Sequence, residues 1–340
     1  MRHWLEPLGL VWGEAAVAAV EDGVALWLAG GPVAFSLVRL VGQGRVVPVA
    51  AVPEACADSL HRLTAAPAPW AGLPAGRVNV MAVVNVTPDS FSDGGRHHAP
   101  ERAIAAARAM LAAGADLVDI GGESTRPGAE PTPPEVEQAR ILPVVRALAA
   151  EGVAVSVDTR NAATMAAALD AGARIVNDVS GLSCDPAAAA LVAARGCPVV
   201  LMHMRGVPAT MHAMASYDDV ALEVAEELAA CMERAEAAGI ARDCIALDPG
   251  LGFAKGPGHN EMLLARLGLL LNLGRPLLVG ASRKSFVGRL GGEAEPSRRG
   301  PGSIAAGLMA VLGGVTILRA HDVAETNQAI RVWQALTGMR

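Results

Sequence analysis

The 340-residue sequence predicts an α/β fold, a (β/α)8 TIM barrel that follows a small N-terminal extension. From Val78 onward, apolar runs of strand length alternate with alanine-rich helical patterns over roughly 260 residues, the usual length of such a barrel. The runs are continuously apolar, which is typical of parallel strands buried on both faces. Almost every run ends in a polar residue, and barrel enzymes assemble their active sites at these strand ends.

The barrel elements are expected in regular order along the chain. Strands are predicted at Asn79–Val84, Leu117–Gly121, Ala154–Asp158, Arg174–Asn177, Val199–His203, Cys244–Asp248, Leu277–Gly280 and Thr316–Arg319. A helical pattern follows each strand, at Glu101–Ala113, Glu135–Ala150, Ala162–Ala171, Pro186–Arg195, Tyr217–Ala238, Glu261–Asn272, Ser303–Leu312 and Val323–Leu336. Glycines such as Gly114 and Gly172 supply the left-handed conformation that ends a helix.

Residues 1–76 are expected to form an extension of uncertain α+β type and unknown function, and residues 77–340 the catalytic barrel. The predicted elements of the extension are helices at Glu14–Val20 and Glu54–Leu63 and strands at Val24–Leu28, Ala34–Leu40 and Val46–Val52. Residues 65–76, rich in Pro, Ala and Gly, are expected to link the two units. Residues 1–76 contain four of the five tryptophans: Trp4, Trp12, Trp27 and Trp70. We therefore expect a patch that packs against the barrel or a second subunit.

Composition argues against several classes of function. The net charge is −6, the basic residues are scattered and only 3% of residues are aromatic, so no nucleic-acid partner is expected. Prolines and glycines interrupt the longest uncharged run, residues 300–318, which favours a buried helix, turn and strand over a membrane span. The five cysteines are odd in number without CxxC spacing, and acidic residues interrupt the N-terminus. We therefore expect a cytoplasmic protein without disulfides or signal peptide.

The connector Asn85–Gly95 follows the first predicted barrel strand directly. It combines an amide, two carboxylates, three hydroxyls, a proline and a glycine pair. Amide and carboxylate oxygens suit Mg²⁺, while hydroxyls and glycine-exposed N–H groups suit phosphate oxygens. The pattern favours a loop that handles a metal ion and a phosphorylated ligand. An ordinary Asx turn before a capped helix is the alternative.

The polar strand ends divide into two chemical sets. The first set offers carboxylates, an amide and an apolar floor: Asp158, Asn177, Asp248, Met202, Phe253 and Gly280. It suits a flat, neutral heterocycle such as a pteridine or a purine. The second set offers a metal ligand, hydroxyls and cations, which suit a diphosphate: Asn85, Thr125, Arg126, Lys284, Ser285, Arg319 and His321. Together the sets indicate a substrate whose diphosphate is a leaving group, with plain helix capping at each strand end as the alternative.

Two further polar groups are expected to be structural. His203 is expected to form hydrogen bonds at the end of its strand. The acidic residues around Glu223–Glu227 are expected to form a solvated helix face.

The strand-end motifs together resemble those of bacterial dihydropteroate synthase, a family of pterin-binding barrels. The motifs that carry the resemblance are Asn85–Gly95, Gly121–Gly128, Val155–Thr159, Asn177–Val179, Leu201–Gly206, Asp248–Phe253, Gly280–Ser285 and Arg319–Val323. They match in order over about residues 78–337, which is far more specific than any single motif.

The resemblance implies a transferase of folate biosynthesis. Such an enzyme joins 4-aminobenzoate to 6-hydroxymethyl-7,8-dihydropterin diphosphate and releases diphosphate. It also implies Mg²⁺, a homodimer, small molecules as the substrates, and no membrane or nucleic-acid partner.

The resemblance further implies roles for the matching positions. Asn85 is expected to bind the metal, and the expected diphosphate residues are Asn85, Thr125, Arg126, Arg319 and His321. The expected pterin residues are Asp158, Asn177, Met202, Asp248, Phe253, Gly280 and Lys284. The expected 4-aminobenzoate residues are Thr125, Pro127, Phe253, Lys284 and Ser285. Catalytic roles are implied for Asp158, Asp248, Lys284 and Arg319, and mobile loops for Asp89, Ser90, Phe91, Ser92 and Ser124.

The sequence departs from the family pattern at a few apolar positions. Leu251, Ala254 and Ala320 stand where Phe, Gly and Val are more usual, and the first 76 residues lie outside the resemblance. Two other functions stay open at this stage. A corrinoid-linked methyltransferase with a related barrel has no use for the diphosphate residues. A non-catalytic pterin-binding paralogue is expected to have lost some of them.

Overall fold

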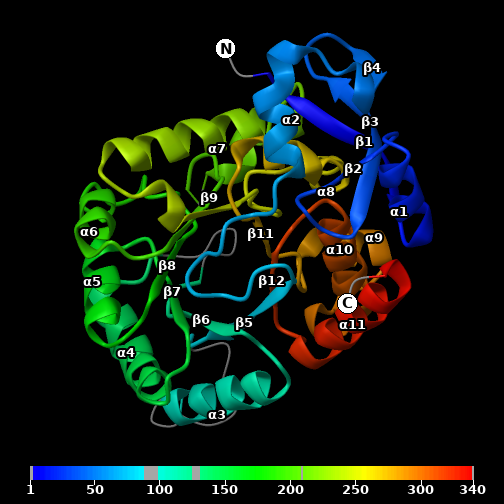
Figure 1. Cartoon of the computed structure of the whole chain (residues 1–340). Coiled ribbons are helices and arrows are strands. Elements are labelled where there is room, and N and C mark those ends of the chain that lie inside the picture. The colour runs from blue at the N-terminus through cyan, green and yellow to red at the C-terminus, as the bar shows by residue number, and fades with distance from the viewer. Residues whose placement is uncertain (1–2, 88–98, 125–130, 208–209, 339–340) are drawn as a thin grey trace.

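The computed structural model describes residues 3–87, 99–124, 131–207 and 210–338, and within them the barrel closes. An eight-stranded sheet has the order β10-β9-β8-β7-β6-β5-β12-β11, and all its pairs are parallel. A parallel bridge between Leu247 and Leu277 joins the two ends of that order. The strands therefore form a ring with helices outside it (Figure 1), which confirms the predicted fold class.

The barrel strands lie within one or two residues of their predicted ends. They are β5 (Asn79–Asn85), β6 (Leu117–Gly121), β7 (Val155–Asp158), β8 (Ile175–Asp178), β9 (Val199–Met202), β10 (Ile245–Asp248), β11 (Leu278–Val279) and β12 (Ile317–Ala320). The helices around them are α3 (Ala99–Ala112), α4 (Pro134–Ala150), α5 (Ala162–Asp170), α6 (Ala188–Arg195), α7 (Val220–Ala237), α8 (His259–Ala265), α9 (Ser285–Gly291), α10 (Gly300–Leu312) and α11 (Val323–Thr337).

Two helical segments differ from the prediction. The pattern at Glu261–Asn272 divides into α8 and a 3₁₀ segment, η7 (Leu267–Leu273). A Cβ on Gly268 would lie 2.6 Å from the Pro7 Cγ, so the extension approaches the backbone of η7 very closely. Helix α9 was not predicted, because it is short and contains two glycines.

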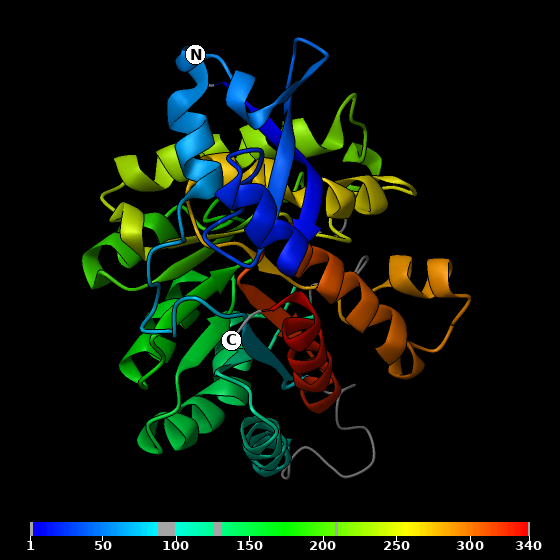
Figure 2. The same ribbon diagram turned by 45° about the vertical axis from the view of Figure 1, so that its right-hand side comes forward.

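The extension forms a small antiparallel sheet with two helices, and Figures 1 and 2 both place it along one side of the barrel. Its elements are β1 (Leu5–Trp12), α1 (Glu14–Glu21), β2 (Leu26–Trp27), β3 (Val33–Leu40), β4 (Arg45–Pro48), η1 (Val49–Ala51), η2 (Glu54–Cys56) and α2 (Ala57–Thr64). Strand β1 was not predicted, because Pro7 and Gly9 interrupt its apolar pattern. The predicted strand at Val46–Val52 is shorter, since it turns into η1.

Buried polar contacts attach the extension to the barrel. The Glu6 carboxylate accepts hydrogen bonds from Arg266 Nε at 2.8 Å and Arg266 Nη2 at 3.0 Å. Arg266 also reaches Asp219, whose side chain caps α7. The Asn272 side chain pairs with the backbone of Leu5, accepting from its N–H at 3.2 Å and donating to its carbonyl at 2.7 Å. These bonds cover the start of β1, which would otherwise be an open sheet edge.

The segment between α2 and β5 crosses the end of the barrel at which the strands begin (Figure 1). It connects the two parts, as expected of a linker, but it is also packed. Trp70 and Leu73 are buried against residues at the starts of the strands, including Met81, Leu117 and Ile175. The Trp70 indole donates a hydrogen bond to the Cys244 carbonyl at 2.7 Å. Trp70 thus closes this end of the barrel.

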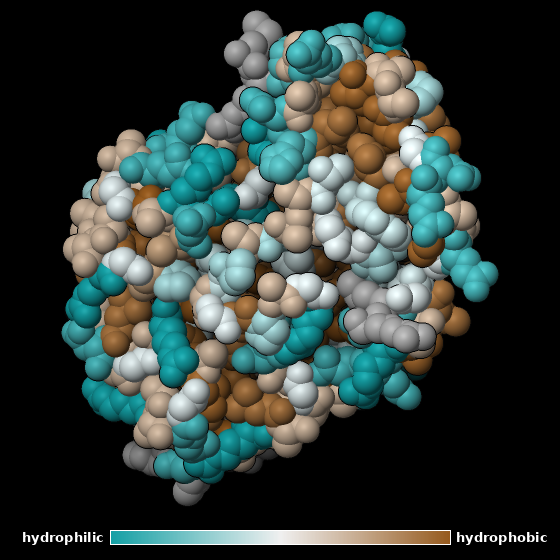
Figure 3. Space-filling model, viewed as in Figure 1, coloured by the Kyte–Doolittle hydropathy of each residue, from teal (hydrophilic) through white to brown (hydrophobic). Residues whose placement is uncertain are grey.

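The tryptophans of the extension have different environments. Trp4 and Trp70 are buried, whereas Trp12 is 48% exposed. Figure 3 shows apolar side chains gathered over the extension. Val24 and Val46 of the extension are also exposed. The run at residues 300–318 forms α10, a turn and the start of β12, as expected. Among the described residues, no helix has both the length and the apolar character needed to cross a membrane.

Replacing Trp70 with Ala should lower the free energy of unfolding by about 3–5 kcal/mol, because it removes a large buried side chain and leaves a cavity. Trp12→Ala is the matched control and should change it by less than about 1 kcal/mol, since Trp12 is half exposed. Urea unfolding monitored by circular dichroism measures both. Equal losses in the two variants would contradict the closing role of Trp70.

Candidate active site

Four adjacent strands end in one row of residues in register. Asn85 on β5 pairs with Gly121 on β6, Gly121 with Asp158 on β7, and Asp158 with Asn177 on β8. Gly121 has no side chain, and a Cβ there would lie 3.7 Å from Asn85 Oδ1 and 3.6 Å from Asp158 Oδ2. The row therefore presents an amide oxygen and a carboxylate on either side of a small open cradle.

A buried ion-pair cluster lies beside this row. Arg319 on β12 donates from Nε to Asp119 Oδ2 and from Nη2 to Asp158 Oδ2, each at 2.7 Å. Asn177 Nδ2 donates to the same Asp119 oxygen at 2.9 Å. One arginine thus joins β6, β7 and β12 across the mouth of the barrel.

Asp119 was not predicted as a site residue, although it is the most deeply buried member of the cluster. Its side chain has no solvent exposure, and it holds both Arg319 and Asn177. The signal in the sequence was a charge inside the otherwise apolar strand at Leu117–Gly121. A carboxylate in such a place requires a buried partner.

Burial and opposite charges shift the pKa values in the cluster. Burial raises the pKa of Asp158 to about 7, although the positive charge of Arg319 opposes the shift. Burial alone would lower the pKa of Arg319, but the carboxylates of Asp119 and Asp158 raise it, so the guanidinium stays charged. Asp158 therefore changes protonation state near neutral pH while Arg319 does not.

A second cluster is built by the loop after β10 and by Lys284. Burial raises the pKa of Asp248, opposed by the charge of Lys284, and burial lowers the pKa of Lys284 to about 8. The Lys284 ammonium donates to the Leu251 carbonyl and lies 4.9 Å from the centre of the Phe253 ring. The nitrogen of Gly250 donates to Asp248 Oδ1 at 2.7 Å.

Backbone geometry fixes this loop. A Cβ on Gly250 would lie 2.0 Å from the His203 carbonyl oxygen, so only glycine fits there. Ala254, which stands where the family more often has glycine, has φ of 48°, in the left-handed region that favours glycine. Leu251, another departure from the family pattern, is fully buried.

The remaining predicted residues lie around these clusters. His321 Nδ1 lies 3.0 Å from Ser282 Oγ, and a Cβ on Gly280 would lie 3.6 Å from the Arg319 Cβ. Met202 is buried at the end of β9, and Ser285 is exposed at the start of α9.

Several predicted residues lie outside the described part of the chain. They are Asp89, Ser90, Phe91 and Ser92 of the first loop and Thr125, Arg126 and Pro127 of the second. Ser124 is described and half-buried. Just before it, Glu123 accepts two hydrogen bonds from Arg160, at 2.9 and 3.0 Å, and one from the Thr132 nitrogen at 2.9 Å. These bonds fix the points where the second loop leaves and rejoins the barrel.

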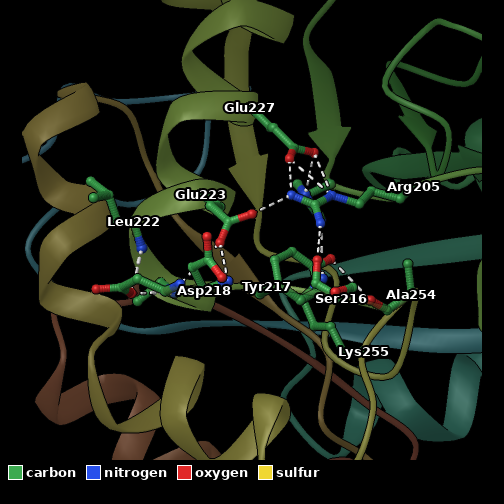
Figure 4. Close-up of polar contacts among 12 residues, drawn as sticks. Arg205, Ser216, Tyr217, Asp218, Leu222, Glu223, Glu227, Ala254 and Lys255 are labelled. Carbon is green, nitrogen blue, oxygen red and sulfur yellow. Dashed lines mark hydrogen bonds and ion pairs between the residues drawn. The ribbon is translucent and has the colours of Figure 1, made fainter. Parts of the chain in front are cut away.

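The acidic residues Glu223 and Glu227, predicted to lie on a solvated helix face, are partly exposed, with side-chain exposures of 29% and 41%, but they also form ion pairs. Arg205 donates to both carboxylates, and its guanidinium lies 3.9 Å from the centre of the Tyr217 ring (Figure 4). His203 Nε2 lies 2.9 Å from Glu227 Oε2, which confirms His203 as a hydrogen-bonding strand-end residue. Arg205 lies just after β9, and its hydrogen bonds to both acids connect the end of this strand to α7.

A cavity of about 100 Å³ lies at the opposite end of the barrel from these clusters. Trp70, Leu73, Asn79 and Val315 are among its lining residues. It contains none of the buried carboxylates or lysines at the carboxyl ends of the strands. Barrel chemistry takes place at those strand ends, so the cavity is not the active site.

Comparisons with known proteins agree with this geometry. The family of pterin binding enzymes matches residues 81–321. The dihydropteroate synthase of Escherichia coli K12 is 46% identical over 258 residues, which cover 76% of this chain and 91% of the relative. The chain belongs to the dihydropteroate synthase family. It is therefore a transferase that forms dihydropteroate, and the resemblance seen in the strand-end motifs is confirmed.

Solved structures of the family have the same barrel. Dihydropteroate synthase of Xanthomonas albilineans with 4-aminobenzoic acid is 48% identical, with a TM-score of 0.73 over 76% of this chain and 93% of that one. The Xanthomonas albilineans enzyme in complex with 7,8-dihydropteroate is aligned at 45% identity and a TM-score of 0.70, over 76% of this chain and 94% of that one.

Asp119→Asn should lower the free energy of unfolding by about 3 kcal/mol, because it removes one charge from a buried ion pair. Asp243→Asn is the matched control. Asp243 pairs with Arg275 at 2.9 Å, but its side chain is 83% exposed, so the loss should be below about 1 kcal/mol. Urea unfolding at pH 7 measures both. The same small loss in both variants would contradict the view that Asp119 stabilises the fold by holding Arg319 and Asn177.

Proposed function

We propose that this chain condenses 6-hydroxymethyl-7,8-dihydropterin diphosphate with 4-aminobenzoate at the mouth of the barrel, and that Asp158, Asp248, Lys284 and Arg319 carry the chemistry. The observation that supports this most directly is the Asp119–Arg319–Asp158 cluster beside Asn85. It combines acids suited to a cationic heterocycle with a cation suited to a departing diphosphate.

The proposed pterin subsite lies between the two clusters. Asn177 and Asp158 would meet polar edges of the ring, and Asp248 and Lys284 would meet the opposite side. Asn177 is oriented by its bond to Asp119, and Lys284 by its bond to the Leu251 carbonyl. Met202, Phe253 and Gly280 would form the apolar floor and the close backbone approach.

The proposed diphosphate subsite uses Asn85, Arg319 and His321, with Thr125 and Arg126 of the second loop. Arg319 bonds the two carboxylates through Nε and Nη2, so Nη1 is its remaining nitrogen. The Asn85 oxygen borders the cradle over Gly121. Within the described residues, no group of three or more His, Cys, Asp or Glu could hold a metal ion. This donor set fits Mg²⁺ only as an ion bound mainly by phosphate oxygens and water, with Asn85 as a protein ligand.

The reaction needs one bond broken and one formed. The bond between the exocyclic methylene carbon and the diphosphate oxygen breaks, and both electrons leave with diphosphate. The aminobenzoate nitrogen then bonds to that carbon and loses one proton to solvent. Mg²⁺, when bound, would neutralise charge on the leaving group. Asp158 and Asp248 would stabilise the positive charge that spreads over the dihydropterin, and Arg319 and His321 would stabilise the departing diphosphate.

The proposed 4-aminobenzoate pocket lies at the outer rim of the site. Phe253 and Lys284 would contact the aromatic ring, and Ser285 and Lys284 the carboxylate, with Thr125 and Pro127 from the second loop. The 4.9 Å contact between the Lys284 ammonium and the Phe253 ring supports a shared wall between the pterin and aminobenzoate subsites.

Diphosphate release tests the proposed function. Purified protein should release diphosphate from the dihydropterin substrate only when Mg²⁺ and 4-aminobenzoate are both present. Release that does not depend on aminobenzoate would overturn the proposal. A methyltransferase or a non-catalytic paralogue would give no release at all.

Asn85→Ala should weaken Mg²⁺-dependent binding of the dihydropterin diphosphate about tenfold, because it removes the proposed metal ligand. Binding of a free pterin, which carries no diphosphate, should change less than about twofold. Isothermal titration with and without Mg²⁺ separates the two. Equal weakening of both ligands would show that Asn85 does not act through the metal.

The pH dependence of kcat/KM should be bell-shaped. The value of kcat/KM should fall below about pH 7, where Asp158 becomes protonated and can no longer stabilise a cation. It should also fall above about pH 8, where Lys284 loses its proton and leaves Asp248 without its counter-charge. The control is Asp158→Asn, whose residual activity should lack the acidic limb. A flat profile across neutral pH would exclude both assignments.

We further propose that residues 77–340 form the catalytic unit and that residues 1–76 brace it structurally. We also propose that the whole chain works in the cytoplasm as a homodimer. The Glu6–Arg266 pair and the Asn272–Leu5 bonds support the bracing role, because they fix the extension to η7. A truncation that starts at Val78 would remove the brace, and its activity and subunit number test the division.

A further inference from the structure

Lysine is almost absent from this chain. Of the 28 basic residues, Lys255 and Lys284 are the two lysines, and all the others are arginines. Both lysines contact the loop that follows β10, and Lys255 is only 4% exposed. Arginine is the basic residue at every other position, so lysine at these two suggests that each needs a compact amine rather than a guanidinium. Lys284 belongs to the proposed pterin site, whereas Lys255 has no assigned role.

The Lys255 amine holds the loop that carries Phe253. Its Nζ donates to the Phe253 carbonyl at 3.0 Å and lies 3.0 Å from His203 Nδ1. Both contacts are buried or partly buried, so solvent competes with them weakly. The backbone of Phe253 is thereby tied to the end of β9, where His203 lies.

A chain of polar contacts extends from Lys255 to α7. His203 Nε2 lies 2.9 Å from Glu227, and Glu227 accepts from Arg205 Nε at 2.9 Å. Arg205 also donates to Glu223 at 2.8 Å. Burial and the charge of Lys255 lower the pKa of His203 to about 4, so its ring is neutral. A neutral ring that accepts from Lys255 at Nδ1 donates to Glu227 from Nε2, so the hydrogen bonds run in one direction.

The residue between Phe253 and Lys255 is strained. Ala254 has φ of 48°, and such a conformation persists only where neighbouring contacts enforce it. Lys255 holds the Phe253 carbonyl, and the Tyr217 hydroxyl donates to the Ala254 carbonyl at 2.9 Å. Arg205 stacks over the Tyr217 ring, so both ties belong to one network (Figure 4).

We propose that Lys255 is a positioning residue for 4-aminobenzoate, which it serves by holding Phe253 and the strained Ala254 in place through the His203–Glu227–Arg205 network. The proposal rests on the proposed function, in which Phe253 is a wall of the aminobenzoate pocket and a part of the pterin floor. Lys255 touches neither substrate. Its loss lets the Phe253 ring leave Lys284, and the aminobenzoate subsite loses its shape while the pterin residues on the strands stay in place.

The charges around Lys255 agree with a positioning role. Burial lowers its pKa to about 7, although the carboxylates of Asp248 and Glu227 oppose the shift, and Lys284 and Arg205 add to it. Arginine at this position would bring a larger, permanently charged group into a space enclosed by His203 and the loop backbone.

Steady-state kinetics of Lys255→Met test the proposal. The KM for 4-aminobenzoate should rise about tenfold, with kcat within about threefold of wild type. The KM for the dihydropterin diphosphate should rise no more than about threefold, because Phe253 is only one part of the proposed pterin floor and the strand residues still hold the ring. Tyr217→Phe removes the second tie without touching Lys255, and Glu227→Gln weakens the chain at α7. Both should shift the same KM in the same direction by a smaller factor. Glu236→Gln is the matched control on the same helix, since Glu236 pairs with the solvent-exposed Arg242, and it should behave as wild type.

An independent readout uses the scarcity of lysine. Protein labelled with ¹³C at lysine Cε should give two lysine signals, assigned by comparison with Lys255→Met. Glu227→Gln should move the Lys255 signal, and Glu236→Gln should leave it in place. This measurement needs no turnover, so it stands even if the wild-type enzyme releases no diphosphate and the proposed function fails.

The possible outcomes separate the hypotheses. A selective rise in the aminobenzoate KM together with a moved Lys255 signal supports the positioning role. Equal rises in both KM values, a fall in kcat alone, or no change in any variant overturns it. If Lys255→Met does not fold, the Tyr217→Phe and Glu227→Gln results decide, because neither substitution removes the charge of the loop lysine.

Discussion

The active end of this barrel depends on one buried arginine that two carboxylates share. Arg319 lies between Asp119 and Asp158 and pairs with one carboxylate oxygen of each at 2.7 Å, so two strands share one buried counter-charge. The cost of this arrangement is visible in the pKa of Asp158, which burial raises to about 7 despite the nearby guanidinium. A site with charges held in this balance can accept a substrate whose ring becomes positive while its diphosphate departs negative.

The fold places the charged residues at one end of the barrel and the apolar packing that stabilises it at the other. Parallel register brings Asn85, Gly121, Asp158 and Asn177 into one row at the carboxyl ends of the strands. At the other end, Trp70 and a cluster of apolar residues close the barrel. Contacts such as Glu6–Arg266 then bind the extension to the outside. The strand ends are therefore free to hold residues that burial disfavours, because the rest of the chain provides the packing.

Much of this could be predicted from the sequence, and the failures have physical reasons. The barrel strands could be located because continuous apolar runs with polar ends are characteristic of parallel strands buried on both faces. Strand β1 could not, because Pro7 and Gly9 break its alternation, and its edge is completed by Asn272, which lies 267 residues beyond Leu5. The buried role of Asp119 and the pairing of Glu227 with Arg205 could not be predicted, for a related reason. A carboxylate shows its role only through its partner, and Arg319 and Arg205 reach these acids through space and not through sequence neighbourhood.

Arg319 opposes the effect of burial on the pKa of Asp158, and carboxyl NMR tests this opposition most directly. Protein labelled with ¹³C at the aspartate carboxyl carbons should give an Asp158 signal, assigned with Asp158→Asn, that titrates near pH 7. In Arg319→Met the same signal should titrate at a higher pH, because the charge that favours the carboxylate is gone. An Asp158 pKa in the ordinary range of about 4, or one that does not move in Arg319→Met, would contradict the account.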